Sequence, residues 1–263
     1  MIAVLGAGVM GELFVAGFIR GGTDPHRIVI AEAREDRARE VSKRHGVRVL
    51  PAAEAVAEAA TVLLLVKPQD MAALLADIAP RTPTDSLVIS LAAGVRLDTL
   101  EAAFGPGTPC IRAMPNTPAV VDEGMIALSP GASCSPAQAE YAESLLSAVG
   151  RVVRVPEDLQ DAVTATSGSG PAYVFLLVES MIDAAVGLGL DPQTARTLVT
   201  QTVLGAALMA RTPDADAADL RRQVTSPGGT TAAAIAVFEE GDLRGLVARA
   251  MTAARDRGRE LGR

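Results

Sequence analysis

The chain of 263 residues is poor in several residue types that many functions require. It has no tryptophan, only 3% aromatic residues and a net charge of −7, so it lacks the stacking side chains and basic surface of nucleic-acid-binding proteins. Cys110 and Cys134 do not have the spacing of metal ligands; free thiols are the simplest interpretation, and no metal is expected. No apolar run reaches the ~18 to 20 residues of a membrane span, and an apolar strand expected from residue 1 leaves no space for a signal peptide. We therefore expect a cytoplasmic protein without a nucleic-acid or membrane partner.

Lysine and histidine are also scarce. The only lysines are Lys43 and Lys67, and the only histidines are His26 and His45. Everything after Lys67 therefore lacks the two side chains that most often act as positioned acids. The hydrophobic content of 49% is nevertheless sufficient for one large domain or two modest ones.

The most informative pattern lies at the start of the chain. An apolar run over residues 2–5 leads into Gly6, Gly8 and Gly11, the G-x-G-x-x-G spacing of a dinucleotide-binding loop. In such a loop the first glycine allows a tight turn, the second leaves space for the pyrophosphate, and the third lets a helix pack against the strand. The helix N-terminus then directs free amides at the phosphates. We expect this loop to hold a cofactor through Gly6, Ala7, Gly8, Val9, Met10 and Gly11.

Further candidate ligand contacts follow other expected strands. Residues 27–31 end beside Glu32, about 20 residues after the last glycine, where a carboxylate binds the adenosine ribose. The apolar runs at 61–66 and 87–91 are followed by flexible or polar residues at the sheet edge where open α/β folds bind ligands. Those residues are Lys67, Pro68 and Gln69 after the first run, and Ala92, Ala93 and Gly94 after the second. Lys67 could equally be a surface lysine.

One further loop is open to two interpretations, and one charged segment has a simple interpretation. Asn116 lies between prolines after the strand expected at 110–114, so this loop either holds a carboxamide or is a plain turn. The charged segment 35–45 is most simply a solvated helix face.

After Pro156 the strand pattern disappears and the sequence is helical to its end. We expect one domain over residues 1–156 and a second over 157–263. Residues 198–209 are apolar on nearly every side of a helix, which predicts burial in an interlocked homodimer. Residues 225–231 combine glycines and hydroxyls before another helix, a pattern suited to a small carboxylate or, alternatively, to an elaborate helix cap.

Over its whole length the chain resembles the pyrroline-5-carboxylate reductase family. The resemblance rests on residues 2–11 (IAVLGAGVMG), 66–69 (VKPQ), 92–94 (AAG), 114–118 (MPNTP), 167–173 (SGSGPAY) and 224–231 (VTSPGGTT) in this order. It implies an α/β Rossmann domain with a mostly parallel, doubly wound sheet, followed by an all-α dimerisation domain, with rings of dimers in many members. It also implies the last step of proline biosynthesis, reduction of (S)-1-pyrroline-5-carboxylate to L-proline with NADH or NADPH.

Carried over by position, the resemblance also implies the roles of individual residues. The cofactor would be held by residues 6–11 and by Val66, Lys67, Pro68 and Gln69, with Ala92, Ala93 and Gly94 beside its nicotinamide end. Asn116 would contact both cofactor and substrate. The substrate carboxylate would be bound by Ser226, Gly228, Gly229 and Thr230, and Thr231 would place its hydroxyl near the ring nitrogen as the catalytic residue.

The chain departs from the family pattern at the ribose site and before residue 224. Members that prefer NADPH usually carry short polar or basic residues where Glu32 and Ala33 stand, and often asparagine in place of Ala53. Glu32 would repel a ribose 2′-phosphate, whereas Arg34 could attract one, so the coenzyme preference stays open. Asp214 matches only loosely a glutamate that some members place near the ring nitrogen.

Two alternatives are weighed against this function. A β-hydroxyacid dehydrogenase relies on a catalytic lysine in its helical domain, and no lysine follows Lys67. A non-catalytic NAD(P)-binding oligomer would have no need for residues 226–231, which are intact. An imine that arrives protonated supplies its own electrophilicity, so positioning by hydroxyls and amides suffices, whereas a ketone would require an acid.

Overall fold

The computed structural model describes residues 1–261 and divides into two compact units, each of which is described by itself. The first contains Met1–Ser169 with the segment from Ala254 onward, and the second contains Gly170–Ala253. Because Glu157 and Asp161 pair with Arg112 of the sheet, the residues just after Pro156 belong spatially to the first unit. A domain boundary at residue 156 stays a prediction.

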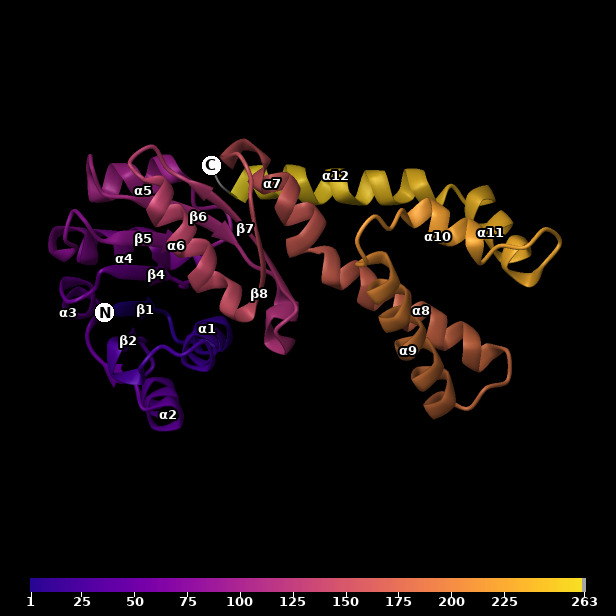
Figure 1. The fold of residues 1–263 in the computed structure, drawn as a ribbon, viewed down its shortest axis with the longest axis horizontal. Coiled ribbons are helices and arrows are strands. Elements are labelled where there is room, and N and C mark those ends of the chain that lie inside the picture. Colours follow the sequence, from indigo (N-terminus) through magenta and orange to yellow (C-terminus); the bar gives the residue numbers. More distant parts are fainter. Residues whose placement is uncertain (262–263) are drawn as a thin grey trace. The chain divides into compact units, whose positions relative to one another are not determined.

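The first unit is built on an eight-stranded sheet with the order β3-β2-β1-β4-β5-β6-β7-β8 (Figure 1). All neighbouring strands are parallel except β6 and β7, so the predicted mostly parallel, doubly wound sheet is confirmed. The strands are β1 (Ile2–Leu5), β2 (Ile28–Ala31), β3 (Arg48–Val49), β4 (Thr61–Leu64), β5 (Leu87–Ser90), β6 (Cys110–Met114), β7 (Gly124–Pro130) and β8 (Gly150–Arg154).

Helices cover both faces of the sheet, which explains why the central strands are mostly apolar, with Thr61 in β4, Ser90 in β5 and Arg112 in β6 as polar exceptions. In β1, Ile2 and Val4 point into one core, and Ala3 and Leu5 point into the other. The first core is closed by α1 (Val9–Arg20), α2 (Glu35–His45) and α6 (Pro136–Leu146), and the second by α3 (Ala52–Ala57), α4 (Pro68–Ile78) and α5 (Leu97–Phe104).

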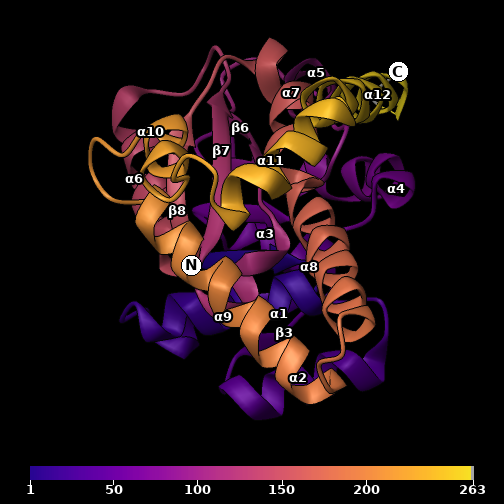
Figure 2. The same cartoon turned by 90° about the vertical axis from the view of Figure 1, so that its right-hand side faces the viewer.

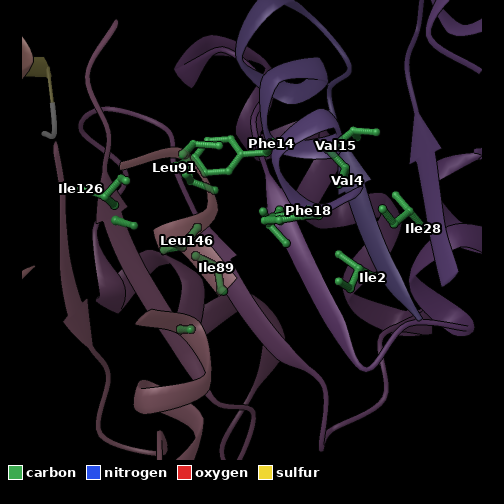
Figure 3. Close-up of a cluster of buried hydrophobic side chains, with 14 of the residues drawn as sticks. Ile2, Val4, Phe14, Val15, Phe18, Ile28, Ile89, Leu91, Ile126 and Leu146 are labelled. Carbon is green, nitrogen blue, oxygen red and sulfur yellow. The ribbon is translucent and has the colours of Figure 1, made fainter. Parts of the chain in front are cut away.

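The first core contains the two aromatic side chains of α1. Phe14 and Phe18 are fully buried, with ring centroids 5.9 Å apart, and lie among the aliphatic side chains labelled in Figure 3. This packing fixes α1 against the sheet and therefore fixes the loop that joins it to β1.

Short helical segments complete the first unit. They are η1 (Pro25–Arg27), η2 (Ala79–Arg81), η3 (Thr117–Val121), η4 (Ser147–Val149), η5 (Glu157–Leu159), α7 (Gln160–Val163) and the π-helical turn η6 (Thr164–Gly168).

The second unit is entirely helical, as expected. Its helices are α8 (Gly170–Gly187), α9 (Pro192–Ala210), α10 (Ala217–Gln223), α11 (Thr230–Glu240) and α12 (Leu243–Leu261), the last of which extends past Ala253. Asp191 caps α9 by accepting hydrogen bonds from the amides of Gln193 and Thr194, as its position before Pro192 predicts. Helices α8 and α9 lie side by side (Figures 1 and 2).

One helical stretch differs from the expectation that no segment could span a membrane. Glu157–Gly187 contains an 18-residue window that is apolar enough to span a membrane, with a mean hydropathy of 1.3 and no buried residue within that window. Glu179 and Asp183 interrupt the apolar run, which is why no continuous run of sufficient length is seen in the sequence. Such a helix is weak evidence for a membrane, because an apolar helix in a protein interface has the same composition.

Candidate active site

The three glycines of the first loop have different surroundings. Gly6 adopts φ +98°, and a Cβ atom there would lie 2.8 Å from the carbonyl oxygen of Leu65. A Cβ at Gly11 would overlap the carbonyl group of Gly6, so the helix can approach the strand end only without a side chain here. A Cβ at Gly8, in contrast, would meet nothing within 4 Å.

The free space beside Gly8 suits a ligand diphosphate. Helix α1 begins at Val9, and its first backbone hydrogen bond runs from the amide of Glu12 to the carbonyl of Gly8 at 3.0 Å. The amides of the first turn therefore have no partner within the helix and are available to an anion.

The loop opens into a crevice of about 1070 Å³ in the first unit. The crevice lies where β1, β2 and β4 end, and β1 is the point at which the chain turns from building one half of the sheet to building the other. It is lined by Leu5, Gly6, Gly8, Ala31, Glu32, Ala33, Arg34, Leu50, Pro51, Ala52, Leu65, Val66, Lys67, Gln69, Asp70 and Leu74. The predicted cofactor residues Gly6, Gly8, Glu32, Arg34, Val66 and Lys67 therefore line one cavity.

Glu32 and Arg34 form an ion pair in this crevice. The Oε1 atom of Glu32 accepts hydrogen bonds from the backbone amide of Arg34 at 3.2 Å and from its Nε at 3.3 Å. The side chain of Glu32 is only 10% exposed, whereas that of Arg34 is 64% exposed. The carboxylate is thus held in place, and the guanidinium group extends toward solvent.

The remaining predicted cofactor residues do not line this cavity. Gly94, with φ +78°, borders a separate cavity of about 390 Å³ whose lining includes the buried Arg112 and its partners Glu157 and Asp161. The others are Ala7, Val9, Met10 and Gly11 in the loop and first turn of α1, Pro68 at the start of α4, and Ala92 and Ala93 after β5.

Asn116 uses its carboxamide within the first unit. Its Oδ1 accepts a hydrogen bond from the amide of Met125 at 2.8 Å, and its Nδ2 donates to the carbonyl oxygen and the hydroxyl of Ser167 at 3.2 and 3.3 Å. These bonds tie the end of β6 to β7 and to the π-helical turn η6.

The predicted substrate loop lies in the second unit. Gly228 adopts φ +70°, the amide of Gly229 donates to the carbonyl oxygen of Ser226 at 3.0 Å, and α11 begins at Thr230. The N-cap residue of α11, Gly229, provides no side-chain hydrogen bond, so the first amides of the helix and the exposed hydroxyls of Ser226 and Thr230 are available to a ligand.

One residue beside the glycine loop after β1 was not predicted from the sequence. Arg37, the third residue of α2, is only 15% exposed and donates through Nε to the carbonyl oxygen of Ala7 at 3.0 Å. The interpretation of segment 35–45 as a solvated face is therefore wrong for this side of the helix. Because 30 residues separate Arg37 from Ala7, no local pattern identifies the contact.

The cysteines show no sign of a metal site or a disulfide. Both are free thiols, and burial raises the pKa of Cys110 to about 12, which suppresses its thiolate form. Over residues 1–261, no group of three or more His, Cys, Asp and Glu side chains is arranged to hold a metal ion.

Comparison with known proteins gives matches over the whole chain. Residues 157–261 match the family described as pyrroline-5-carboxylate reductase dimerisation, and residues 1–94 match the family described as NADP oxidoreductase coenzyme F420-dependent. The chain is 41% identical to a pyrroline-5-carboxylate reductase of Mycobacterium tuberculosis and 43% identical to one of Pseudomonas aeruginosa, covering 99% of this chain and 96% of each relative.

Solved structures agree with these matches. A pyrroline-5-carboxylate reductase from Coxiella burnetii superposes with a TM-score of 0.94 at 40% identity, covering 100% of this chain and 98% of that one. The Plasmodium falciparum pyrroline carboxylate reductase, solved with NADP bound, gives 0.88 at 26% identity with the same coverage. A 3-hydroxyisobutyrate dehydrogenase from Mycobacterium tuberculosis matches at 19% identity over 76% of this chain and 69% of that one, with a TM-score of 0.53, and shares the fold alone.

Proposed function

Because this chain belongs to the pyrroline-5-carboxylate reductase family of oxidoreductases, we propose that it reduces the C=N bond of (S)-1-pyrroline-5-carboxylate to give L-proline, the last step of proline biosynthesis. The observation that carries the proposal is the similarity over the full chain, which includes both the glycine loop after β1 and the hydroxyl-rich loop before α11. A cytoplasmic location is part of the same proposal.

The crevice beside the glycine loop fits a nicotinamide coenzyme. Gly8 leaves space that a side chain would fill, the first amides of α1 suit a diphosphate, and Glu32 stands where the ribose hydroxyls bind. When bound, the reduced coenzyme supplies the hydride. The contacts of Ala92, Ala93, Gly94 and Asn116 with its nicotinamide end belong to the proposal.

The second unit supplies the groups for the substrate. The amides at the start of α11, together with Ser226, Gly228, Gly229 and Thr230, would bind the carboxylate, because a helix N-terminus favours negative charge. Thr231 would place its hydroxyl near the ring nitrogen, either as a hydrogen-bond partner or, for an imine that arrives unprotonated, as the relay for the proton that the nitrogen takes up. Since the imine can arrive protonated, these groups need only bind and orient it, a contribution of at most about 7 to 11 kcal/mol to lowering the barrier.

The first test is an assay of nicotinamide oxidation with pyrroline-5-carboxylate as substrate. We expect rapid oxidation that depends on the imine. Coenzyme binding without oxidation would favour the non-catalytic alternative. Oxidation with a β-keto acid but not with the imine would favour the β-hydroxyacid dehydrogenase alternative.

We further propose that the Glu32–Arg34 pair sets the coenzyme preference. Glu32→Gln is expected to raise kcat/KM for NADPH relative to NADH by about tenfold, because it removes one negative charge near a 2′-phosphate. Arg34→Ala should shift the ratio in the opposite direction, since the exposed guanidinium is the nearby cation. Steady-state assays with both coenzymes measure the ratio.

Glu35→Gln is the matched control for Glu32→Gln. It removes the same charge three residues away, but Glu35 is 87% exposed and pairs with Arg39 on the solvent side of α2. If Glu35→Gln changes the coenzyme ratio as much as Glu32→Gln does, the ribose site is not at Glu32.

We also propose that the second unit forms a homodimer and that these dimers assemble into a larger ring. Large apolar side chains of α8 and α9 are exposed in the single chain: Val174, Phe175, Leu176, Leu177, Val186, Leu198, Leu204, Leu208 and Met209. Such a surface is too extensive for a monomer in water.

Sedimentation tests the dimer. We expect the wild-type chain at micromolar concentration to sediment as a dimer or larger species, and the double variant Leu204→Glu/Leu208→Glu to sediment as a monomer, because it places charges in the proposed apolar interface. Ala73→Glu, on an exposed position of α4, adds a charge to the first unit and should leave the assembly unchanged. A monomeric wild-type chain would contradict the proposal.

A further inference from the structure

Arg37 lies directly behind the glycine loop. Its Nε donates to the carbonyl oxygen of Ala7 at 3.0 Å, and its Nη2 donates to the carbonyl oxygen of Gly8 at 3.4 Å. One guanidinium group therefore contacts two successive peptide units of the loop that opens into the crevice.

These two contacts set the direction of the loop amides. In a trans peptide the carbonyl and the N–H that follows it point in opposite directions, and the described chain has no cis peptide bond. With the carbonyls of Ala7 and Gly8 held toward Arg37, the N–H groups of Gly8 and Val9 point away from it. The same amides are the ones that the proposed function assigns to the coenzyme diphosphate.

Arg37 is itself held rigidly by carboxylates. Its Nη1 donates to Glu40 at 2.8 Å, and its Nη2 also pairs with the carboxylate of Glu12 on α1. Glu12 is further bonded to Arg44 and to the Nε2 of His45, which lies 2.9 Å from its Oε1. The planar guanidinium fork is thus fixed in one orientation before any ligand binds.

Glu12 and Arg37 each favour the ionised form of the other. Burial raises the pKa of Glu12, but hydrogen bonds from His45 and Arg37 outweigh it and hold the pKa below its ordinary value. The hydrogen bond to Glu40, opposed by burial and supported by Glu12, raises the pKa of Arg37. Both partners therefore remain ionised, and the cluster presents donors to the loop carbonyls at all physiological pH values.

We propose that Arg37 is a positioning residue for coenzyme binding: by fixing the peptide planes of Ala7 and Gly8, it preorganises the loop amides for the diphosphate. The inference rests on the proposed function, because it assumes that the loop binds the coenzyme. It assigns to Arg37 an effect on the diphosphate and none on the adenosine part of the ligand.

The test compares ADP with adenosine, each measured as a competitor of NADH in fluorescence titrations without turnover. Arg37→Met is expected to weaken ADP about tenfold, in keeping with the loss of hydrogen bonds from a charged donor, and to leave adenosine unchanged. A loss of folded protein would affect the ADP and adenosine titrations equally, so it would not change the ratio of the two affinities. Arg39→Met removes the same charge from the exposed side of α2 and should leave both affinities unchanged.

Two further variants separate the possible explanations. Arg37→Lys retains the charge but cannot bond two carbonyls through a planar fork, so it should also weaken ADP severalfold; wild-type affinity in this variant would overturn the inference. Equal weakening of ADP and adenosine in Arg37→Met would overturn it too. If Gly8→Val prevents ADP binding while Arg37→Met does not affect it, only the role of Arg37 fails. If Gly8→Val leaves ADP binding unchanged, the loop assignment itself fails.

Discussion

Gly8→Val is expected to weaken coenzyme binding by about 100-fold, equivalent to about 2.7 kcal/mol, while the protein remains folded. The added side chain would enter the space beside the loop, where a Cβ meets no atom of the protein within 4 Å. The same space is where the proposed diphosphate must approach the amides of α1, so the valine and the ligand exclude each other. Titration of NADH fluorescence measures the affinity, and thermal unfolding verifies the fold.

Two companion variants sharpen this test. Gly8→Ala should weaken binding less than Gly8→Val, because it places fewer atoms in the same space. Gly11→Ala should instead lower the thermal stability, since its Cβ would overlap the carbonyl group of Gly6. Normal NADH affinity in Gly8→Val would show that the diphosphate binds elsewhere.

Thr231→Ala is expected to lower kcat without changing coenzyme affinity. If the hydroxyl relays the proton to the ring nitrogen, the loss should be about 100-fold. If it only donates a hydrogen bond, the loss should be about tenfold. Thr231 is the second residue of α11, on the helix that presents the proposed carboxylate site, so its loss should act on the substrate alone. Steady-state kinetics with pyrroline-5-carboxylate, together with NADH titration, separate the two effects.

The chain offers a matched control and a rescue for this prediction. The hydroxyl of Thr225 in the same loop donates to the carbonyl oxygen of Arg221 at 2.6 Å, so Thr225→Ala removes a threonine hydroxyl that is already engaged and should leave kcat within about twofold of the wild-type value. Thr231→Ser keeps the hydroxyl and should restore most of the turnover. Unchanged kcat in Thr231→Ala would remove Thr231 from the mechanism.

The sequence by itself determined the sheet, the glycine loop and the order of the elements. Strands buried on both faces are predominantly apolar, so β1, β4 and β5 are visible as short, almost continuous apolar runs. A side chain at Gly11 would collide with Gly6, five residues earlier, and one at Gly6 would collide with Leu65 at the end of the neighbouring strand. The G-x-G-x-x-G spacing in the sequence reflects these two steric requirements. The resemblance to the pyrroline-5-carboxylate reductase family supplied the prediction of the substrate, because the shared motifs lie in both halves of the chain.

Only the tertiary structure decided which side chains surround the loop. Arg37 appears in sequence as one of several charges on a helix, and its burial against Ala7 depends on how α2 packs beside α1. The carboxamide bonds of Asn116, to Met125 nine residues away and to Ser167 51 residues away, are likewise set by the folded chain. A charged or amide side chain can form equally good bonds with water or with protein. Which partner such a side chain binds therefore depends on contacts between distant segments, whereas the backbone of a glycine turn or a buried strand is constrained locally.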